Sequence, residues 1–234
     1  MKIAFLGKGG SGKSTMATAF VRELRARGVR VLAIDADHNM DLSYNLLSYN
    51  SAAEPSLFLG NDPERIKEYV GSTRTDTYLN ALKVAKERDI IFTLAPIDEY
   101  TKSISIELED GLRLVTAGPH TDRIRSQEYC SHSLAAPLKV YLPLLDLKSN
   151  EAVVIDERAG TDPVATGILS GVDLAVIVRE PTVNSARVAE QIKNELRLAN
   201  IAHIIVENKQ AGIEADTARA AEAIFTFLAR PMER

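Results

Sequence analysis

Short apolar runs alternate with longer segments of helical periodicity along most of this 234-residue chain. The runs are rich in Ile, Val, Leu and Ala, and several end beside Gly, Asp or Asn, which is typical of buried strands. Strands are predicted at residues 2–6, 29–35, 89–95, 112–117, 152–156, 172–178 and 202–207. Their alternation with helices predicts an α/β fold, a mostly parallel sheet with helices on both faces.

Helices are predicted at residues 15–28, 40–48, 133–145, 183–199 and 214–223, with a polar helix-like stretch at 62–88. That stretch begins with Asp62-Pro63-Glu64, which is a helix start signal. Residues 56–60 predict a turn, and the charged residues 96–111 predict a hairpin or loop. Residues 224–228 are compatible with a longer final helix, but their Ile, Phe and Thr favour an edge strand. At this length, residues 1–234 are expected to form a single domain.

The turn after the first strand carries the clearest chemistry. Residues 7–15, called the phosphate loop below, match the pattern G-x-x-x-x-G-K-[ST] between a strand and a helix. Glycines let the backbone approach phosphates closely, and a helix N-terminus favours anions. Lys13 is expected to reach the β and γ phosphates, and the Ser14 hydroxyl to bind Mg²⁺. The motif predicts a P-loop NTPase fold with a nucleotide site at Gly9, Gly10, Ser11, Gly12, Lys13, Ser14 and Thr15.

Three aspartates lie at or just after the ends of predicted strands near this loop. Asp35 and Asp156 end apolar runs, and Asp37 follows Asp35 by two residues. Ligands of open α/β sheets bind at the carboxyl ends of the strands, so these side chains are expected beside the phosphate loop. Asp35 and Asp156 are predicted to hold Mg²⁺, partly through water, and Asp37 to orient the attacking water.

Lys8 narrows the predicted class of P-loop protein. The sequence G-K-G-G-x-G-K-S-T from Gly7 to Thr15 resembles the deviant Walker A motif. This motif belongs to dimerising ATPases: MinD and ParA proteins, the nitrogenase iron protein, arsenite and tail-anchored-protein ATPases, and metallocentre maturation ATPases. The resemblance implies that Lys8 reaches the nucleotide of the partner subunit, and therefore a nucleotide-dependent homodimer. It extends from Met1 to about Lys209 and is vague between residues 50 and 130.

The two switch segments of that family are also similar here. Switch I often reads D-x-D-P, whereas this chain has His38 after Asp37. Switch II of the maturation ATPases often reads D-M-E-A-G, and residues 156–160 read D-E-R-A-G. The backbone N–H of Gly160 is expected to sense the γ-phosphate. These segments most resemble the carbon monoxide dehydrogenase maturation branch, which implies a nickel metalloenzyme as client.

The sequence marks the nucleotide base less clearly than the phosphate site. Asn208-Lys209 resembles the base-reading corner of P-loop NTPases, without the aspartate that reads guanine, so ATP is predicted. Pro181 and Pro231 lie in segments that resemble the family's adenine pocket.

The maturation ATPases carry a C-x-C near residue 130, where this chain has Cys130-Ser131-His132. One Cys and one His from each subunit would suit Zn²⁺ or Ni²⁺ at a dimer interface; the alternative is an unpaired loop cysteine.

Composition limits the alternatives. The net charge of −4 argues against bulk nucleic-acid binding, and a lone cysteine suits a reducing compartment. No apolar run reaches membrane-spanning length, so a cytoplasmic protein without a membrane partner is expected. Three other functions stay open: a ParA- or MinD-type positioning ATPase acting on DNA or membrane, a nucleotide-binding module with little turnover, and a kinase or ligase.

Overall fold

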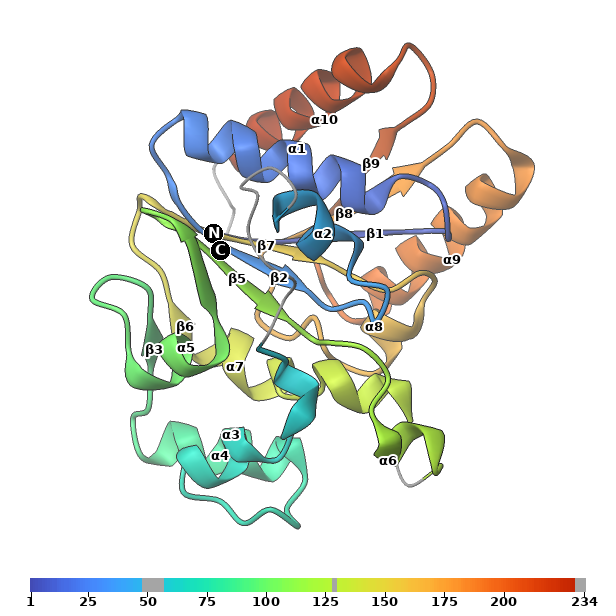
Figure 1. Ribbon diagram of the computed structural model, residues 1–234. Coiled ribbons are helices and arrows are strands. Elements are labelled where there is room, and N and C mark those ends of the chain that lie inside the picture. Colours follow the sequence, from blue (N-terminus) through green and yellow to red (C-terminus); the bar gives the residue numbers. More distant parts are fainter. Residues whose placement is uncertain (48–56, 128–129, 230–234) are drawn as a thin grey trace.

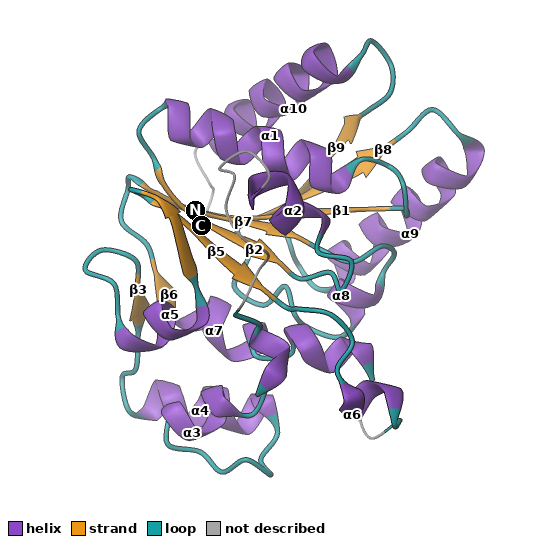
Figure 2. Ribbon diagram, viewed as in Figure 1, coloured by secondary structure: helices purple, strands orange, loops and turns teal. Residues whose placement is uncertain are grey.

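A twisted seven-stranded sheet runs through the centre of the molecule with helices on both faces (Figures 1 and 2). The computed structural model describes residues 1–47, 57–127 and 130–229. The strand order is β4-β5-β2-β7-β1-β8-β9, and the pairs are parallel except for β4 with β5. The strands are β1 (Lys2–Gly7), β2 (Arg30–Asp35), β4 (Ile106–Glu109), β5 (Leu112–Thr116), β7 (Glu151–Asp156), β8 (Leu174–Arg179) and β9 (His203–Glu207).

Helices cover both faces of the sheet, because the side chains of each strand alternate between the two faces and form a core on each. In β1, Ile3 and Phe5 pack in one core and Ala4 and Leu6 in the other, because successive side chains point to opposite faces. The first core packs against α1 (Lys13–Ala26), α2 (Asp41–Leu47) and α10 (Ile213–Leu228). The second packs against α7 (Leu138–Leu144), α8 (Asp162–Ala165) and α9 (Val183–Leu198). None of the helices in the described residues is both long and apolar enough to cross a bilayer.

A smaller group of elements lies below the β5 side of the sheet (Figure 1). It contains α3 (Arg65–Tyr69), α4 (Tyr78–Glu87), α5 (Glu99–Ile104) and a two-stranded sheet of β3 (Phe92–Thr93) and β6 (Leu145–Asp146). The ring of Phe92 is fully buried and lies 5.0–5.9 Å from the rings of Tyr69, Tyr100 and Tyr141. Among the described residues, the remaining short helices are α6 (Asp122–Arg125) and the 3₁₀ turns Leu59–Asn61 and Ser131–Ala135.

Two predicted strands of the main sheet were wrong. Residues 89–95 contribute only β3, which pairs with β6 outside the main sheet. Residues 224–228 continue α10 and do not form an edge strand. Ala220 and Ile224 are buried one helical turn apart in the core under α1, so the burial of this face outweighs β propensity.

Other segments were predicted in part. Residues 62–88 form two helices, α3 and α4, where a single polar stretch was expected. Residues 96–111, predicted as a hairpin or loop, contain α5, which was not predicted, and β4, which forms one arm of a hairpin with β5. The predicted helix at 133–145 begins with a 3₁₀ turn and continues as α7. Ser56 and residue 48, at the ends of a predicted turn and helix, lie outside the described residues.

The aromatic cluster around Phe92 makes a testable contribution to stability. Phe92→Ala is expected to lower the free energy of unfolding by about 3–5 kcal/mol, because a fully buried ring leaves a cavity among three tyrosines. Urea unfolding followed by circular dichroism measures the change. Leu198→Ala is the control, since Leu198 is 83% exposed at the end of α9. Equal effects of the two substitutions would contradict the assigned packing.

Candidate functional site

The phosphate loop joins β1 directly to α1 at the carboxyl edge of the sheet. Gly12 has φ of 92°, a left-handed conformation that glycine adopts without strain. A Cβ atom at this position would also lie 2.1 Å from Asn208 Nδ2. Lys13 follows as the first residue of α1 and is buried. The glycine is therefore required both by the turn and by the close approach of Asn208.

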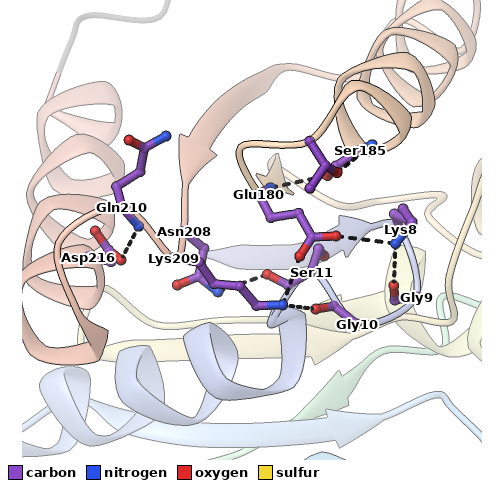
Figure 3. Close-up of polar contacts among 11 residues, drawn as sticks. Lys8, Gly9, Gly10, Ser11, Glu180, Ser185, Asn208, Lys209, Gln210 and Asp216 are labelled. Atoms are coloured by element: carbon purple, nitrogen blue, oxygen red, sulfur yellow. Dashed lines mark hydrogen bonds and ion pairs between the residues drawn. The ribbon is translucent and has the colours of Figure 1, made fainter.

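Hydrogen bonds from other segments hold the carbonyl groups of the phosphate loop. Asn208 Nδ2 donates to the Ser11 carbonyl at 2.8 Å, and Lys209 Nζ donates to the Gly10 carbonyl at 2.7 Å (Figure 3). On the other side, the Gly160 N–H donates to the Gly7 carbonyl at 3.1 Å. The ends of β7 and β9 thus fix the loop from two directions.

A cavity of about 700 Å³ opens in front of this loop. It lies between the start of α1, α2 and the segment after β9. Its volume falls in the usual range for small-molecule sites. The lining residues are Gly10, Gly12, Lys13, Ser14, Thr15, Asp41, Asn45, Asn208, Lys209, Gly212, Ile213 and Asp216. The structure therefore brings most of the predicted phosphate-binding residues to one cavity; Gly9 and Ser11 belong to the same loop but do not line it.

Asp35 and Asp156 lie side by side at the ends of β2 and β7. They are partners in the register of the two strands, and both are buried. Asp35 accepts hydrogen bonds from the N–H groups of Ser43 at 2.7 Å and Asp37 at 3.2 Å, yet burial raises its pKa to about 7. Burial and the charge of Asp35 raise the pKa of Asp156 well above its ordinary value. Within the described residues, neither carboxylate oxygen of Asp156 has a hydrogen-bond partner.

These carboxylates fit a divalent cation. Oxygen atoms are the ligands that Mg²⁺ prefers, and Mg²⁺ is commonly held by one or two carboxylates together with substrate phosphates. The unpartnered oxygens of Asp156 supply such ligands, and Ser14 and Lys13 lie close enough to lower its pKa in part. Among the residues that the structure describes, no three His, Cys, Asp or Glu side chains cluster as a metal site of their own. The donor set suits a cation that arrives with a phosphate ligand.

Glu157 is a buried carboxylate that the sequence did not mark. Its side chain is 1% exposed, and neither oxygen has a hydrogen-bond partner among the described residues. Burial raises the pKa of Glu157 to about 8. A glutamate after a strand-ending aspartate usually faces solvent, so composition and periodicity carried no signal of its burial.

Asp37 lies in the turn after β2. The strand ends at Asp35, and the Asp37 Oδ1 accepts the N–H of Asn39 at 3.1 Å. His38 Nδ1 lies 3.2 Å from the same oxygen, and the His38 ring stacks on His120 with 4.4 Å between centroids. Asp37 is near enough to raise the pKa of Asp156 and Glu157 through its charge. The contact with His120, which follows β5, was not anticipated from the sequence.

Lys8 points to a carboxylate of its own chain. Its Nζ lies 3.2 Å from Glu180 Oε1 and donates to the Gly9 carbonyl at 3.2 Å (Figure 3). Lys209 Nζ lies 2.7 Å from the second oxygen, Oε2. The hydrogen bonds and charges of Lys209 and Lys8 lower the pKa of Glu180. Sequence reasoning gave Glu180 no role, and the two lysines that it joins are 201 positions apart in sequence.

The expected base-binding residues separate into two places. Asn208 lines the 700 Å³ cavity, but its amide nitrogen is bonded to the phosphate loop. Pro181 lines a neighbouring cavity of about 580 Å³ with Gln210 and Arg219. Pro231 lies outside the described residues. Asp216, missed in the sequence, is buried and accepts the N–H groups of Gln210 and Ala211 at 3.0 and 3.2 Å.

The predicted metal residues, Cys130 and His132, stand on either side of Ser131 in the sequence. Cys130 is exposed and directly precedes the 3₁₀ turn Ser131–Ala135. The side chain of His132 is not among those described. Between them, Ser131 Oγ accepts a hydrogen bond from Arg158 Nη1 at 3.0 Å. The structure therefore places this segment in contact with switch II.

Similar proteins place these features in a family. The CobQ/CobB/MinD/ParA nucleotide binding domain, CbiA, matches residues 3–215. The carbon monoxide dehydrogenase accessory protein CooC of Rhodospirillum rubrum is 32% identical over 210 residues, which are 87% of this chain and 73% of that protein. An uncharacterized ATP-binding protein of Methanocaldococcus jannaschii is 29% identical over 193 residues, covering 82% of this chain and 72% of its own length.

Solved structures share the architecture. A ParA family ATPase from Chlorobium tepidum superposes with a TM-score of 0.53 at 20% identity, over 94% of this chain and 79% of that one. The cell division ATPase MinD of Pyrococcus furiosus superposes with a TM-score of 0.51 at 19% identity, over 96% and 79%. These likenesses confirm the predicted P-loop NTPase fold with its mostly parallel sheet. By its family match and its similarity to CooC, the chain belongs to the CobQ/CobB/MinD/ParA nucleotide binding domain family.

Proposed function

We propose that this protein is an Mg²⁺-dependent ATPase that forms a homodimer around two ATP molecules. The observation that carries the proposal is the buried, unpartnered carboxylate of Asp156 beside Asp35 at the phosphate loop. Unpaired buried carboxylates are costly, and a cation bound with a triphosphate removes that cost. Ser14, Asp35 and Asp156 would hold Mg²⁺, which would neutralise the negative charge that develops on the phosphates.

ATP is the nucleotide that the base end of the cavity favours. A guanine-reading site needs a carboxylate free to accept hydrogen bonds from the base. The carboxylate that lines this cavity near Asn208 and Lys209 is Asp216, whose oxygens already accept two backbone N–H groups. We assign adenine to the segment after β9, with Asn208 and Lys209 nearby. Pro181, which lines the neighbouring cavity, would be an additional contact.

Hydrolysis would be divided among a few residues of this site. Lys13 binds the β and γ phosphates, and Asp37 orients the attacking water in the turn after β2. The Gly160 N–H, now bonded to the Gly7 carbonyl, exchanges that partner for the γ-phosphate. Lys8 contributes a positive charge to the phosphates of the partner subunit. Little covalent chemistry is required, since positioning and charge stabilisation dominate phosphoryl transfer.

As the protein on which this ATPase acts, we favour a metalloenzyme of the carbon monoxide dehydrogenase type, whose metal centre the ATPase would help to mature. The support is the 32% identity to CooC and the position of Cys130-Ser131-His132 beside switch II. The alternative is a positioning ATPase, which the similarity in fold to ParA and MinD structures keeps open. The net charge of −4 disfavours DNA as the partner. The use of ATP and a lone cysteine suit the reducing cytoplasm.

Asp37→Ala tests the hydrolytic role. The variant is expected to bind ATP and to hydrolyse it at least about 100-fold more slowly, because the water loses its orienting carboxylate. Phosphate release under single-turnover conditions measures the rate, and size-exclusion chromatography should show a dimer that persists with ATP. Asp122→Ala, at a carboxylate that is 97% exposed, is the control. An unchanged rate in Asp37→Ala would remove Asp37 from the mechanism.

Asp156→Asn tests the cation site through two opposite effects. Without nucleotide, the variant is expected to be more stable than the parent at pH 8. The raised pKa means that folding favours the protonated acid, so parental stability falls as pH rises from the unfolded value, near 4, toward the folded value. With ATP, the variant should lose the Mg²⁺-dependent stabilisation, about 2–3 kcal/mol at saturating ligand. Thermal unfolding at pH 5 and pH 8 with Mg²⁺ or EDTA separates the effects, with Asp122→Asn as control.

Cys130→Ser and His132→Ala test the metal site. If the two residues form a shared site, the ATP-bound dimer should retain about one Zn²⁺ or Ni²⁺, as two-fold symmetry with Cys₂His₂ ligation requires. Either substitution should abolish retention, as measured by mass spectrometry of metals after gel filtration. His203→Ala, in β9, is the matched control. Equal metal content in all four proteins would leave Cys130 as an ordinary loop cysteine.

A further inference from the structure

Glu180 holds two lysines of the nucleotide site with one carboxylate. Oε1 lies 3.2 Å from Lys8 Nζ and Oε2 lies 2.7 Å from Lys209 Nζ, so each oxygen serves one cation (Figure 3). Both lysines also donate to carbonyls of the phosphate loop, Lys8 to Gly9 and Lys209 to Gly10. The carboxylate therefore ties the loop to the end of β8 through two separate ion pairs.

The position of Glu180 is fixed by its surroundings. Its side chain is 11% exposed, whereas Lys8 and Lys209 are 35% and 53% exposed. The Glu180 N–H donates to Ser185 Oγ at 3.1 Å, and Ser185 is buried in the first turn of α9. The Thr182 hydroxyl in turn accepts the N–H of Ser185 at 3.2 Å. Lys8 can move away on its long, partly exposed side chain, whereas the backbone of Glu180 is held in place by Ser185.

We propose that Glu180 is a latch that holds Lys8 within its own subunit until the nucleotide of a partner subunit displaces it. The inference rests on the proposed function, because it requires Lys8 to act across a dimer. A carboxylate and a triphosphate compete for the same ammonium group, and the triphosphate carries the larger negative charge. Lys209 stays on Glu180 and keeps Gly10 in place when Lys8 leaves. The latch therefore opposes dimerisation unless the partner's nucleotide supplies enough phosphate charge.

Glu180→Gln tests the latch, since the amide keeps the shape but loses the charge. A partly exposed ion pair typically shifts an equilibrium about two- to fivefold. A dimer breaks two such contacts, so the variant should dimerise about tenfold more tightly with Mg²⁺ and a non-hydrolysable ATP analogue. Sedimentation equilibrium measures the dimer constant, and a fluorescent analogue measures nucleotide affinity separately. Glu190→Gln, which removes another glutamate–lysine pair on α9, is the matched control and should match the parent.

Combination with Lys209→Ala decides whether the effect acts through Lys8, because Lys209 is the other lysine paired with Glu180. The gain from Glu180→Gln should persist in the Lys209→Ala background; its disappearance there would assign the gain to Lys209 and overturn the latch. A parent that dimerises with the analogue and a Glu180→Gln variant no tighter than it would also overturn the latch while leaving the proposed function intact. A protein that stays monomeric in both forms would instead refute the ATP-dependent dimer itself. A dimer seen only in Glu180→Gln supports the latch in its strongest form.

Discussion

A pair of buried carboxyl groups where β2 and β7 end is the constraint on which the site depends. Parallel strands in register place Asp35 and Asp156 next to one another, and burial makes their ionised forms unfavourable. The fold alone satisfies Asp35 in part, through the N–H groups of Ser43 and Asp37, but leaves Asp156 unpartnered among the described residues. The phosphate-bound cation that we propose would resolve this conflict. Its binding would favour one state of the site over another, which is how ligand binding can drive a change elsewhere.

The phosphate loop is held in shape by segments that lie near different parts of the proposed ATP site. Asn208 and Lys209, near the proposed base site, bond to the carbonyls of Ser11 and Gly10. Gly160, at the proposed γ-phosphate position, bonds to the carbonyl of Gly7. Base and γ-phosphate therefore act on opposite sides of one short loop. The bond of Gly160 is the one that a triphosphate would break, whereas those of Asn208 and Lys209 can persist.

Sequence patterns predicted the parts of this molecule that local rules determine. The six parallel strands of the main sheet and the phosphate loop follow from apolar runs and glycine spacing. What could not be predicted depends on tertiary contacts. Ile224 belongs to a helix because it packs one turn from Ala220, although its neighbours favour a strand. Glu157 and Glu180 look alike in sequence, yet one is buried without a partner and the other joins Lys8 and Lys209.

Switch II and the cysteine segment are parts of one structural unit. Ala159 lies against Gly9, and Gly160 bonds to Gly7, so this end of switch II touches the phosphate loop. Two residues earlier, the half-buried Arg158 bonds to Ser131, next to Cys130. Arg158 takes the place of the glutamate in the similar D-M-E-A-G pattern, and its long side chain reaches that segment. A displacement of Gly160 by the γ-phosphate would therefore be transmitted through Arg158 to the segment that carries the exposed Cys130.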